Sequence, residues 1–313
     1  MPTSLNSLRV IAFDGGWNLP IWAAQRLGYF EAEGLAIALA YTANSGELVT
    51  GLLAGQHDIA FAGADNFVAY RDGAGEGTAV AEPDLFMFMG GDSGFLSLVA
   101  APGITELAAL RGCGVAVDAM TTGFAFVLRE LLARGGVLES DVRFERAGGT
   151  SQRYAALMDG KFDATLLRTP FDLLAVERGC HCLAYGRELG PYQGTVGAAL
   201  RSWAEAHGDV LEAFLRAYRK GLTWCFDSRN RSMVESLLLS NMKDLVPSCV
   251  VAAADQLLSP DDGLALDMRI DPRGLQTVLN LRKKYATRGA GNDHPSRMHD
   301  YFDHTILDKA LRA

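Results

Sequence analysis

The sequence predicts an α/β fold with two Rossmann-like lobes that face each other across a central cleft. Three observations predict it: short apolar stretches alternate with helical ones over the first two thirds of the chain, small-residue turns separate them, and the whole pattern occurs twice. Parallel strands need crossover connections, so apolar strands separated by helices indicate parallel pairing. A chain of 313 residues is long enough for two such units, since a typical domain has about 150 residues.

One arrangement of strands and helices recurs with an offset of 105 residues. The run Leu52–Phe61 is echoed by Leu157–Leu166, and the same offset places Val10–Ala12 on Val115–Val117. In each half an apolar strand, a small-residue turn, a helix, a second strand, a second helix and a third strand follow one another. Each half is therefore predicted as a β-α-β-α-β unit with helices on both faces of its sheet.

A Gly-x-x-Asp sequence precedes the third strand of each half. Gly55 and Gly160 are expected to end a helix in the left-handed conformation, which glycine adopts without steric cost. Farther along the chain the strand patterns fade, and helices are predicted over 202–227, 232–241 and 272–286, packed outside the two units.

Two glycine-rich segments, Gly90–Gly94 and Glu188–Gly194, are predicted to cross between the halves. Glycine there supplies the backbone freedom of a hinge, although a plain surface turn explains it equally well. The predicted organisation is lobe I over 1–91, lobe II over 92–190, and a return to lobe I with C-terminal helices over 191–313.

The composition excludes several classes of function. The net charge is −8 at pH 7 and no basic run exceeds Lys283–Lys284, so a nucleic-acid partner is not expected. No apolar run reaches the ~18 residues of a membrane span, so direct membrane insertion is not expected either. The first residues lack a basic region followed by an apolar one, and we expect a cytoplasmic chain or one whose export signal was removed.

In open parallel sheets, ligands bind beyond the carboxyl ends of the strands, so three loops of each half should border one cleft. Three loops place hydroxyl or amide side chains beside glycine at the start of a helix, where free N–H groups and the helix dipole attract an anion. Ordinary N-capping is the alternative explanation for each of them. These loops are Asn44-Ser45-Gly46, Thr121-Thr122-Gly123 and Gly148-Gly149-Thr150-Ser151.

Charged and aromatic residues extend the candidate site. Arg146 and Arg168 end two strands, and a guanidinium suits a carboxylate or sulfonate because it donates two parallel hydrogen bonds. The alternative is a solvated arginine or a pair with Glu145. The aromatic candidates could stack on a flat ligand or belong to the core, and the acidic ones could accept hydrogen bonds from an amine or only cap helices. The predicted ligand-binding residues are Asp14, Trp17, Asn18, Tyr41, Asn44, Ser45, Asp65, Asn66, Asp92, Thr121, Thr122, Arg146, Thr150, Arg168 and Tyr192.

Metal, cofactor and catalytic chemistry has little support in the sequence. The only dense Cys/His cluster is Cys180-His181-Cys182, which lacks the second pair of ligands of a zinc site and has the alternation of a strand. No metal, cofactor or catalytic residue is therefore predicted. The five cysteines, an odd number without framework spacing, are expected to be reduced.

The run Trp17–Leu35 carries the most specific resemblance of the chain. It is similar to the opening helix of type 2 periplasmic solute-binding proteins, in the group that binds nitrate, sulfonates, taurine and thiamine-pyrimidine precursors for ABC transporters, where A-x-x-x-G-Y-F-x-x-E-G-L is common. The segments Gly51–Ala60 and Leu107–Val117 match two further patterns of that family, L-x-x-G-x-x-D and L-x-x-L-x-G-x-x-V-x-V.

This resemblance implies a type 2 periplasmic binding protein fold whose two lobes close on one small organic anion, which is a carboxylate, a sulfonate or a heteroaromatic compound. It implies an ABC permease as partner and a periplasmic location, with a cytoplasmic one as the alternative. Related folds also host decarboxylases, desulfinases and a pyrimidine synthase. The alternative function is a cytoplasmic decarboxylase-like, lyase-like or pyrimidine-synthase-like enzyme acting on an aromatic or heterocyclic acid, although residues 14–19 lack the cysteine that desulfinase chemistry would need.

Overall fold

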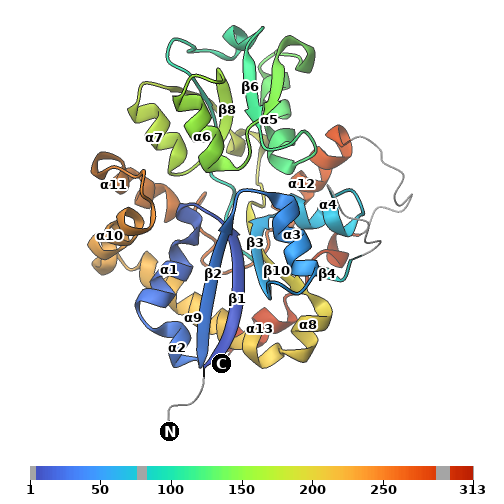
Figure 1. Cartoon of the computed structure of the whole chain (residues 1–313), viewed down its shortest axis with the longest axis vertical. Coiled ribbons are helices and arrows are strands. Elements are labelled where there is room, and N and C mark those ends of the chain that lie inside the picture. Colours follow the sequence, from blue (N-terminus) through green and yellow to red (C-terminus); the bar gives the residue numbers. More distant parts are fainter. Residues whose placement is uncertain (1–4, 76–82, 287–296, 313) are drawn as a thin grey trace.

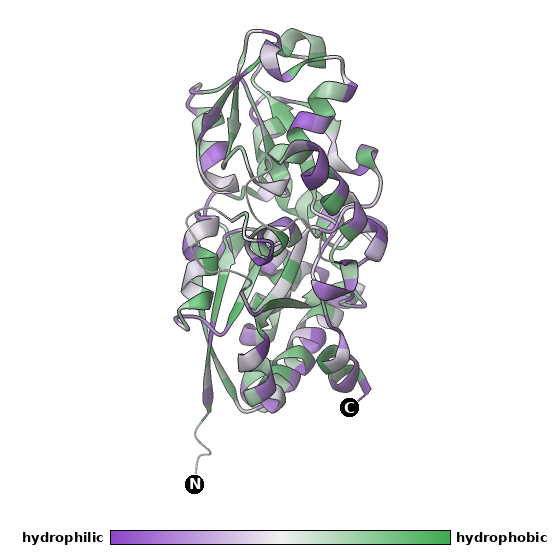
Figure 2. Cartoon of the chain, turned by 90° about the vertical axis from the view of Figure 1, so that its right-hand side faces the viewer, coloured by the Kyte–Doolittle hydropathy of each residue, from purple (hydrophilic) through white to green (hydrophobic). Residues whose placement is uncertain are grey.

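The computed structural model describes residues 5–75, 83–286 and 297–312. The chain forms two α/β lobes, one above the other, each built on a five-stranded sheet with helices around it (Figure 1). Figure 2 shows apolar residues concentrated on the strands inside each lobe. This is the fold class that the sequence predicts.

Lobe I is defined here by the sheet of strand order β2-β1-β3-β10-β4, and lobe II by the sheet of order β7-β6-β8-β5-β9. The strands of lobe I are β1 (Asn6–Phe13), β2 (Leu35–Thr42), β3 (Ile59–Gly63), β4 (Leu85–Gly90) and β10 (Thr195–Leu200). The strands of lobe II are β5 (Leu96–Ala100), β6 (Gly114–Val117), β7 (Arg143–Arg146), β8 (Ala164–Arg168) and β9 (His181–Tyr185). The two sheets share one topology.

The helices fall into three groups along the chain. The first group is α1 (Leu19–Arg26), α2 (Tyr29–Ala32), α3 (Ser45–Leu53) and α4 (Ala64–Arg71), which belong to lobe I. The second group is α5 (Gly123–Arg134), α6 (Thr150–Met158) and α7 (Phe171–Glu177), which belong to lobe II. The third group is α8 (Arg201–Ala206), α9 (Gly208–Phe226), α10 (Arg231–Asn241), α11 (Pro247–Leu257), α12 (Pro272–Tyr285) and α13 (Thr305–Arg312).

The structure confirms the predicted repeat. The bounds of β3 and α3 become those of β8 and α6 when 105 is added to their residue numbers. The strand register agrees as well, because Val10 pairs with Ile59 in lobe I and Val115 pairs with Ala164 in lobe II. Equivalent positions in the two lobes can therefore be compared residue by residue.

The Gly-x-x-Asp sequences have the same structural role in both lobes. Gly55 and Gly160 each have φ of +66°, the left-handed conformation predicted for them. The carboxylate of Asp58 accepts a backbone N–H of β1 at 2.8 Å, and that of Asp163 accepts a backbone N–H of β6 at 2.7 Å. The aspartate thus ties the entry of the third strand to the first strand of its sheet.

Parallel pairing holds for only three strands of each sheet. β10 runs antiparallel to β3 and β4, and β5 runs antiparallel to β8 and β9. The connections explain the difference: the chain passes from β4 into β5, and from β9 into β10, without a crossover helix on a sheet face. Each crossing strand, β5 or β10, therefore begins at the cleft and runs in the direction opposite to the parallel strands of the sheet that it joins.

The C-terminal helices differ from the prediction in two ways. The helix expected over 202–227 is interrupted at His207, where φ is −130° and ψ is 37°, so that α8 and α9 are separate. α11 and α13 were not predicted. The helices also do more than cover lobe I: α9 packs on α1, but α11 packs on α7 of lobe II, and α12 contacts both α4 and α5. α11 and α12 flank the junction of the lobes from opposite sides (Figure 1).

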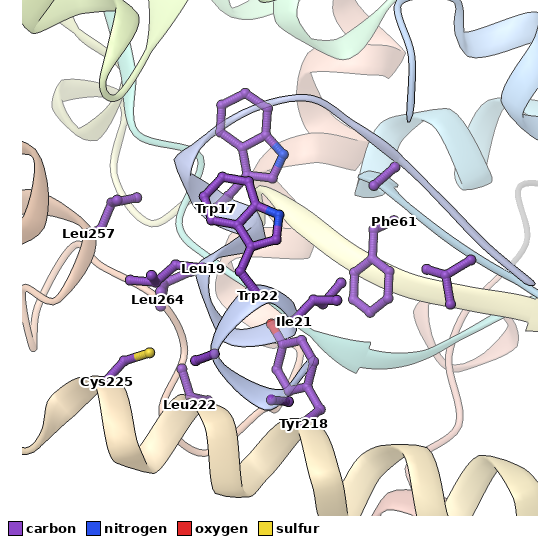
Figure 3. Packing of buried hydrophobic residues seen from close by; sticks show 14 of the residues in the cluster. Trp17, Leu19, Ile21, Trp22, Phe61, Tyr218, Leu222, Cys225, Leu257 and Leu264 are labelled. Carbon is purple, nitrogen blue, oxygen red and sulfur yellow. The ribbon is translucent and has the colours of Figure 1, made fainter. Parts of the chain in front are cut away.

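Part of the lobe I core forms where α1 packs on α9 (Figure 3). Ile21 and Trp22 of α1 are buried together with Tyr218 and Leu222 of α9. The same cluster continues upward to Trp17, in the loop that follows β1. The apolar face of the long helix therefore supports the loop that reaches the junction of the lobes.

Replacing Gly221 by Ala is expected to lower the free energy of unfolding by about 1–3 kcal/mol, the usual cost of overpacking. A Cβ at this position would lie 2.5 Å from the Pro20 carbonyl oxygen and 2.9 Å from the Ala24 Cβ. Gly208→Ala in the same helix is the control, because a Cβ there meets nothing within 4 Å. Urea denaturation measures the effect, and equal unfolding midpoints for the two variants would contradict it.

The two crossings between the lobes lie where the sequence indicates them, in Gly90–Gly94 and in the segment that precedes β10. They are joined to each other by backbone hydrogen bonds: Gly194 N–H donates to the Asp92 carbonyl at 2.9 Å, and Gly91 N–H donates to the Thr195 carbonyl at 2.8 Å.

Three structural findings concern the predicted absences. Among the described residues, no helix combines the length and the apolar character needed to cross a bilayer. In the same ranges, no group of three or more His, Cys, Asp or Glu side chains is arranged to hold a metal ion. Cys180 and Cys182 are free thiols, and the predicted strand at this place is β9.

Candidate functional site

An inner cavity of about 30 Å³ lies between the lobes, at the carboxyl ends of β1, β3, β6 and β8. Both lobes contribute residues to its wall. The residues that line it are Phe13, Trp17, Ser45, Phe61, Ala62, Gly63, Asp65, Asn66, Asp118, Thr122, Gly123, Phe124, Gly149, Thr150, Arg153, Arg168 and Thr195.

An outer cavity of about 240 Å³ adjoins the inner one. The two share the lining residues Ser45, Asp65, Asn66, Asp118 and Thr122. The outer cavity is also lined by Ala43, Asn44, Gly46, Ala69, Tyr70, Ala74, Gly75, Ala119, Thr121, Arg146, Gly148 and Arg282. The cleft is therefore continuous from an apolar and charged interior to a mostly polar mouth.

Arg153 is a buried cation in the wall of the inner cavity. It lies on α6 with only 2% of its surface exposed, and its guanidinium donates to neutral acceptors: the Gly148 carbonyl at 2.7 Å and the Leu166 carbonyl at 3.1 Å. In the described part of the chain no carboxylate forms an ion pair with it. Burial lowers the pKa of Arg153, with Asp118 acting against this change and Arg168 adding to it. An anion in the cavity would supply the missing countercharge.

The N-terminus of α6 opens onto the same place. Its N-cap is Gly149, which has no side chain to accept an N–H of the first turn. The Gly149 N–H donates to the Gln152 side chain at 3.2 Å, and Thr150 lines the inner cavity. The other two predicted helix starts are capped: Asn44 accepts a backbone N–H of α3 at 3.0 Å, and Thr122 accepts one of α5 at 3.4 Å. N-capping thus accounts for two of the three loops, and α6 retains the positive dipole end that attracts an anion.

Arg168 lines the inner cavity and is engaged with the protein. One Nη donates to Asp92 at 2.8 Å and to Thr195 at 3.1 Å, and its Nε donates to the Gly94 carbonyl at 2.8 Å. The guanidinium carbon also lies 3.8 Å from the centre of a Trp17 ring. Arg168 belongs to β8 of lobe II. Its contacts with Asp92 connect lobe II to a crossing, and its contact with Trp17 connects lobe II to lobe I.

The negative charge of Asp65 is also balanced by an ion pair within the protein. Its two carboxylate oxygens accept hydrogen bonds from Arg282 of α12 at 2.7 and 2.6 Å, a bidentate and mostly buried pair. Arg282 also donates to the Thr121 carbonyl of lobe II at 3.3 Å. The pair therefore connects lobe I, α12 and lobe II at the edge of the cleft.

The lobes are in contact around the cavity, so this is a closed arrangement. A Cβ added to Gly149 of lobe II would lie 3.3 Å from Ala43 of lobe I, and one added to Gly63 would lie 3.5 Å from the Phe124 ring. A Cβ on Gly123 would overlap Asp65. The glycines of these loops allow the two backbones to approach each other across the cleft.

Ten of the predicted residues lie in the wall of one or both cavities. They are Trp17, Asn44, Ser45, Asp65, Asn66, Thr121, Thr122, Arg146, Thr150 and Arg168. The other five, Asp14, Asn18, Tyr41, Asp92 and Tyr192, lie outside the lining.

The contacts and exposure of these five residues show where they lie. Asn18 holds its own loop, donating to the Phe13 carbonyl at 2.8 Å, and the Tyr41 hydroxyl accepts the Trp22 indole N–H at 2.7 Å while 45% of the residue is exposed. Asp92 and Tyr192 are buried in the crossings. Asp14 is exposed, and its pKa is raised by partial desolvation and by Asp244.

Among the lining residues outside the predicted set, three carry charge: Arg153, Asp118 and Arg282. Three others are phenylalanines: Phe13, Phe61 and Phe124. Arg153 lies inside a helix, where an arginine is ordinarily exposed, so the neighbouring sequence does not indicate that it is buried. The repeat did contain a signal, because the offset of 105 residues places Arg153 on the buried Leu48.

Comparisons with known proteins agree with this architecture. Residues 18–231 match the family model described as NMT1/THI5 like. No curated protein sequence matches the chain significantly. Among solved structures, the periplasmic nitrate-binding protein NrtA of Synechocystis PCC 6803 superposes with a TM-score of 0.80 at 13% identity, covering 98% of this chain and 89% of that one.

Two further structures have the same periplasmic binding protein fold. The ligand-binding component of an ABC-type import system from Staphylococcus aureus, with zinc bound, has a TM-score of 0.78 at 14% identity and covers 98% of this chain and 100% of that one. The alkanesulfonate-binding protein SsuA of Xanthomonas axonopodis pv. citri, bound to MOPS, has a TM-score of 0.72 at 16% identity, with coverages of 90% and 94%.

Proposed function

The chain belongs to the NMT1/THI5-like family, and from this premise we propose that it is the solute-binding component of an ABC-type importer, with a small organic anion as its ligand. The ligand class is a carboxylate, a sulfonate or an acidic heteroaromatic compound. An ABC permease is the proposed partner, and the periplasm is the proposed location. The nitrate- and alkanesulfonate-binding proteins of the same fold support the choice of an anion.

One observation carries the proposal: the buried guanidinium of Arg153 and the first turn of α6, whose N-cap glycine has no side chain, meet in a cavity lined by both lobes. A buried cation without a carboxylate partner is unfavourable in an empty site. An anion bound there would accept charge-assisted hydrogen bonds from the guanidinium and from backbone N–H groups of the helix. The remaining predicted lining residues, such as Ser45, Asn66 and Thr150, would complete its polar contacts.

Ligand binding is expected to raise the melting temperature of the protein. The test is thermal unfolding with a panel of carboxylates, sulfonates and acidic pyrimidines, each paired with its neutral amide or alcohol. A ligand present at about 100 times its Kd stabilises the folded state by about 2.7 kcal/mol through mass action. A panel in which no anion raises the melting temperature more than its neutral counterpart would contradict the proposed function.

A further inference from the structure

We propose that the ligand is dipolar: besides the anionic group at Arg153, it carries a protonated amine or another strong N–H donor that binds the carboxylate of Asp118. The inference rests on the proposed function and specifies the ligand of the same site. It follows from which charges in the cavity wall are already balanced and which are not.

The repeat shows that these charges are not required by the fold. Arg153 occupies the position equivalent to Leu48, which is fully buried in lobe I, and Asp118 occupies the position equivalent to Phe13. Lobe I builds the same strands and helices with apolar side chains at both places. The two charges of lobe II therefore have a role other than holding the topology together.

Asp118 has an oxygen available for a ligand. It follows β6 and lines both cavities, and one of its oxygens accepts the Thr122 hydroxyl at 2.6 Å. Within the described ranges it forms no ion pair with any Lys, Arg or His. Its negative charge opposes the lowering of the Arg153 pKa, so the two side chains interact electrostatically, but no ion pair joins them.

The other charges that line the inner cavity are already balanced. Arg168 is paired with Asp92, and Asp65 is held by both nitrogens of the Arg282 fork. In the described lining of the inner cavity this leaves Arg153 as the unbalanced cation and Asp118 as the unbalanced anion. A ligand with one charge of each sign would satisfy both.

The apolar part of the ligand would face lobe I. Phe13, Trp17 and Phe61 contribute aromatic rings from that lobe to the cavity wall, and Arg153 and Asp118 belong to lobe II. The two charged groups of the ligand would therefore bind lobe II, and its hydrocarbon or ring would contact the aromatic residues of lobe I.

A ligand that carries only an anionic group is disfavoured by the same geometry. It would neutralise Arg153, but it would also bring a second negative charge close to Asp118 and exclude the water that solvates this carboxylate. Desolvating a carboxylate without a partner is costly, and like charges repel strongly where water is excluded. Replacing the amine by a methyl group of similar size should therefore weaken binding.

Matched molecules test this inference by titration calorimetry on the full chain. 4-(Aminomethyl)benzoate is compared with 4-ethylbenzoate, and 4-aminobutanoate with pentanoate, so that each pair differs by an ammonium group replaced with a methyl group. We expect the amine-bearing member of the better-bound pair to bind about tenfold tighter or more, the size of effect expected for a charge-assisted hydrogen bond.

Asp118→Asn should remove that preference. The affinity for the amine-bearing molecule should fall, and the affinity for its methyl counterpart should stay the same or rise. Asp159→Asn is the matched control, because Asp159 is an exposed aspartate at the opposite end of α6. Equal or tighter binding of the ethyl or pentanoate member by the unmodified chain, or a preference that survives Asp118→Asn, would overturn the dipolar ligand while leaving anion binding intact. If none of the four molecules binds and no anion of the wider panel does, the proposed function fails and this inference fails with it.

Discussion

Arg153→Leu is expected to abolish ligand binding, with a loss of affinity of about 100-fold or more, while the protein stays folded. Four hydrogen bonds to the protein use all but one of the five guanidinium N–H groups, so the variant removes one charge-assisted hydrogen bond to the anion, which contributes about 1.5–3 kcal/mol. It also leaves the anionic group of the ligand buried without a cation, which adds a desolvation penalty. The measurement is titration calorimetry with the ligand that gives the largest thermal shift in the wild-type protein.

The fold should survive this change because Leu is the residue that the repeat places at the equivalent position, Leu48. The variant loses hydrogen bonds from Arg153 to the Gly148 and Leu166 carbonyls, but it also removes a buried charge that has no ion-pair partner. We expect the free energy of unfolding to fall by no more than about 2 kcal/mol.

Arg153→Lys separates charge from geometry in the same site. Lysine keeps the positive charge but lacks the planar fork, so an intermediate loss of affinity is expected. Affinity of Arg153→Leu within threefold of the wild type, measured on a protein with a cooperative unfolding transition, would remove Arg153 from the binding site. It would also remove the main support for the proposed function.

Arg168→Met is expected to destabilise the folded protein by about 3–5 kcal/mol, because it leaves the carboxylate of Asp92 buried without its cation. The Asp92 side chain is buried in the crossing between β4 and β5, and the Arg168 guanidinium is 2.8 Å from it. Asp92 also accepts the backbone N–H of Gly94 and of Thr195, so an uncompensated charge there acts on both crossings. Urea denaturation without ligand measures the loss.

The double variant Arg168→Met/Asp92→Asn tests the cause. An asparagine carries no charge and keeps a side-chain oxygen that can accept the same backbone N–H groups, so the double variant should be more stable than Arg168→Met alone. Additive losses for the two changes would contradict an ion pair as the source of the effect. A loss of stability below about 1 kcal/mol together with weakened ligand binding would restore Arg168 as an anion ligand, as the sequence predicts.

Most of the fold could be predicted from local sequence patterns. The repeat of 105 residues located β1, β3, β6 and β8 together with the turns that precede the third strands, because burial of both sheet faces and left-handed turns leave marks within a few residues. The antiparallel direction of β5 and β10 could not be predicted in this way. The direction of each strand depends on which sheet the strand joins after crossing between the lobes. The apolar residues of the strand look the same in the sequence whether it pairs in parallel or antiparallel.

The candidate site was predicted less completely, for a related reason. Loop positions follow from topology, and ten of the fifteen predicted residues lie in the cavity wall. Which of them are available to a ligand depends on partners far away in the chain. Arg168 is engaged by Asp92, Asp65 by Arg282, and the α3 and α5 starts by their own caps.

The amino-acid sequence by itself determined two similar halves, their order of elements and the loops that meet between them, because hydrophobic periodicity and glycine conformations are properties of neighbouring residues. Only the tertiary structure decided which charges are balanced and which face the cavity without a partner. Ion pairing depends on distances between side chains up to 217 positions apart, as between Asp65 and Arg282, and on the water excluded around them. Arg153 and Asp118 therefore became candidates for ligand binding only after folding had paired the charges around them.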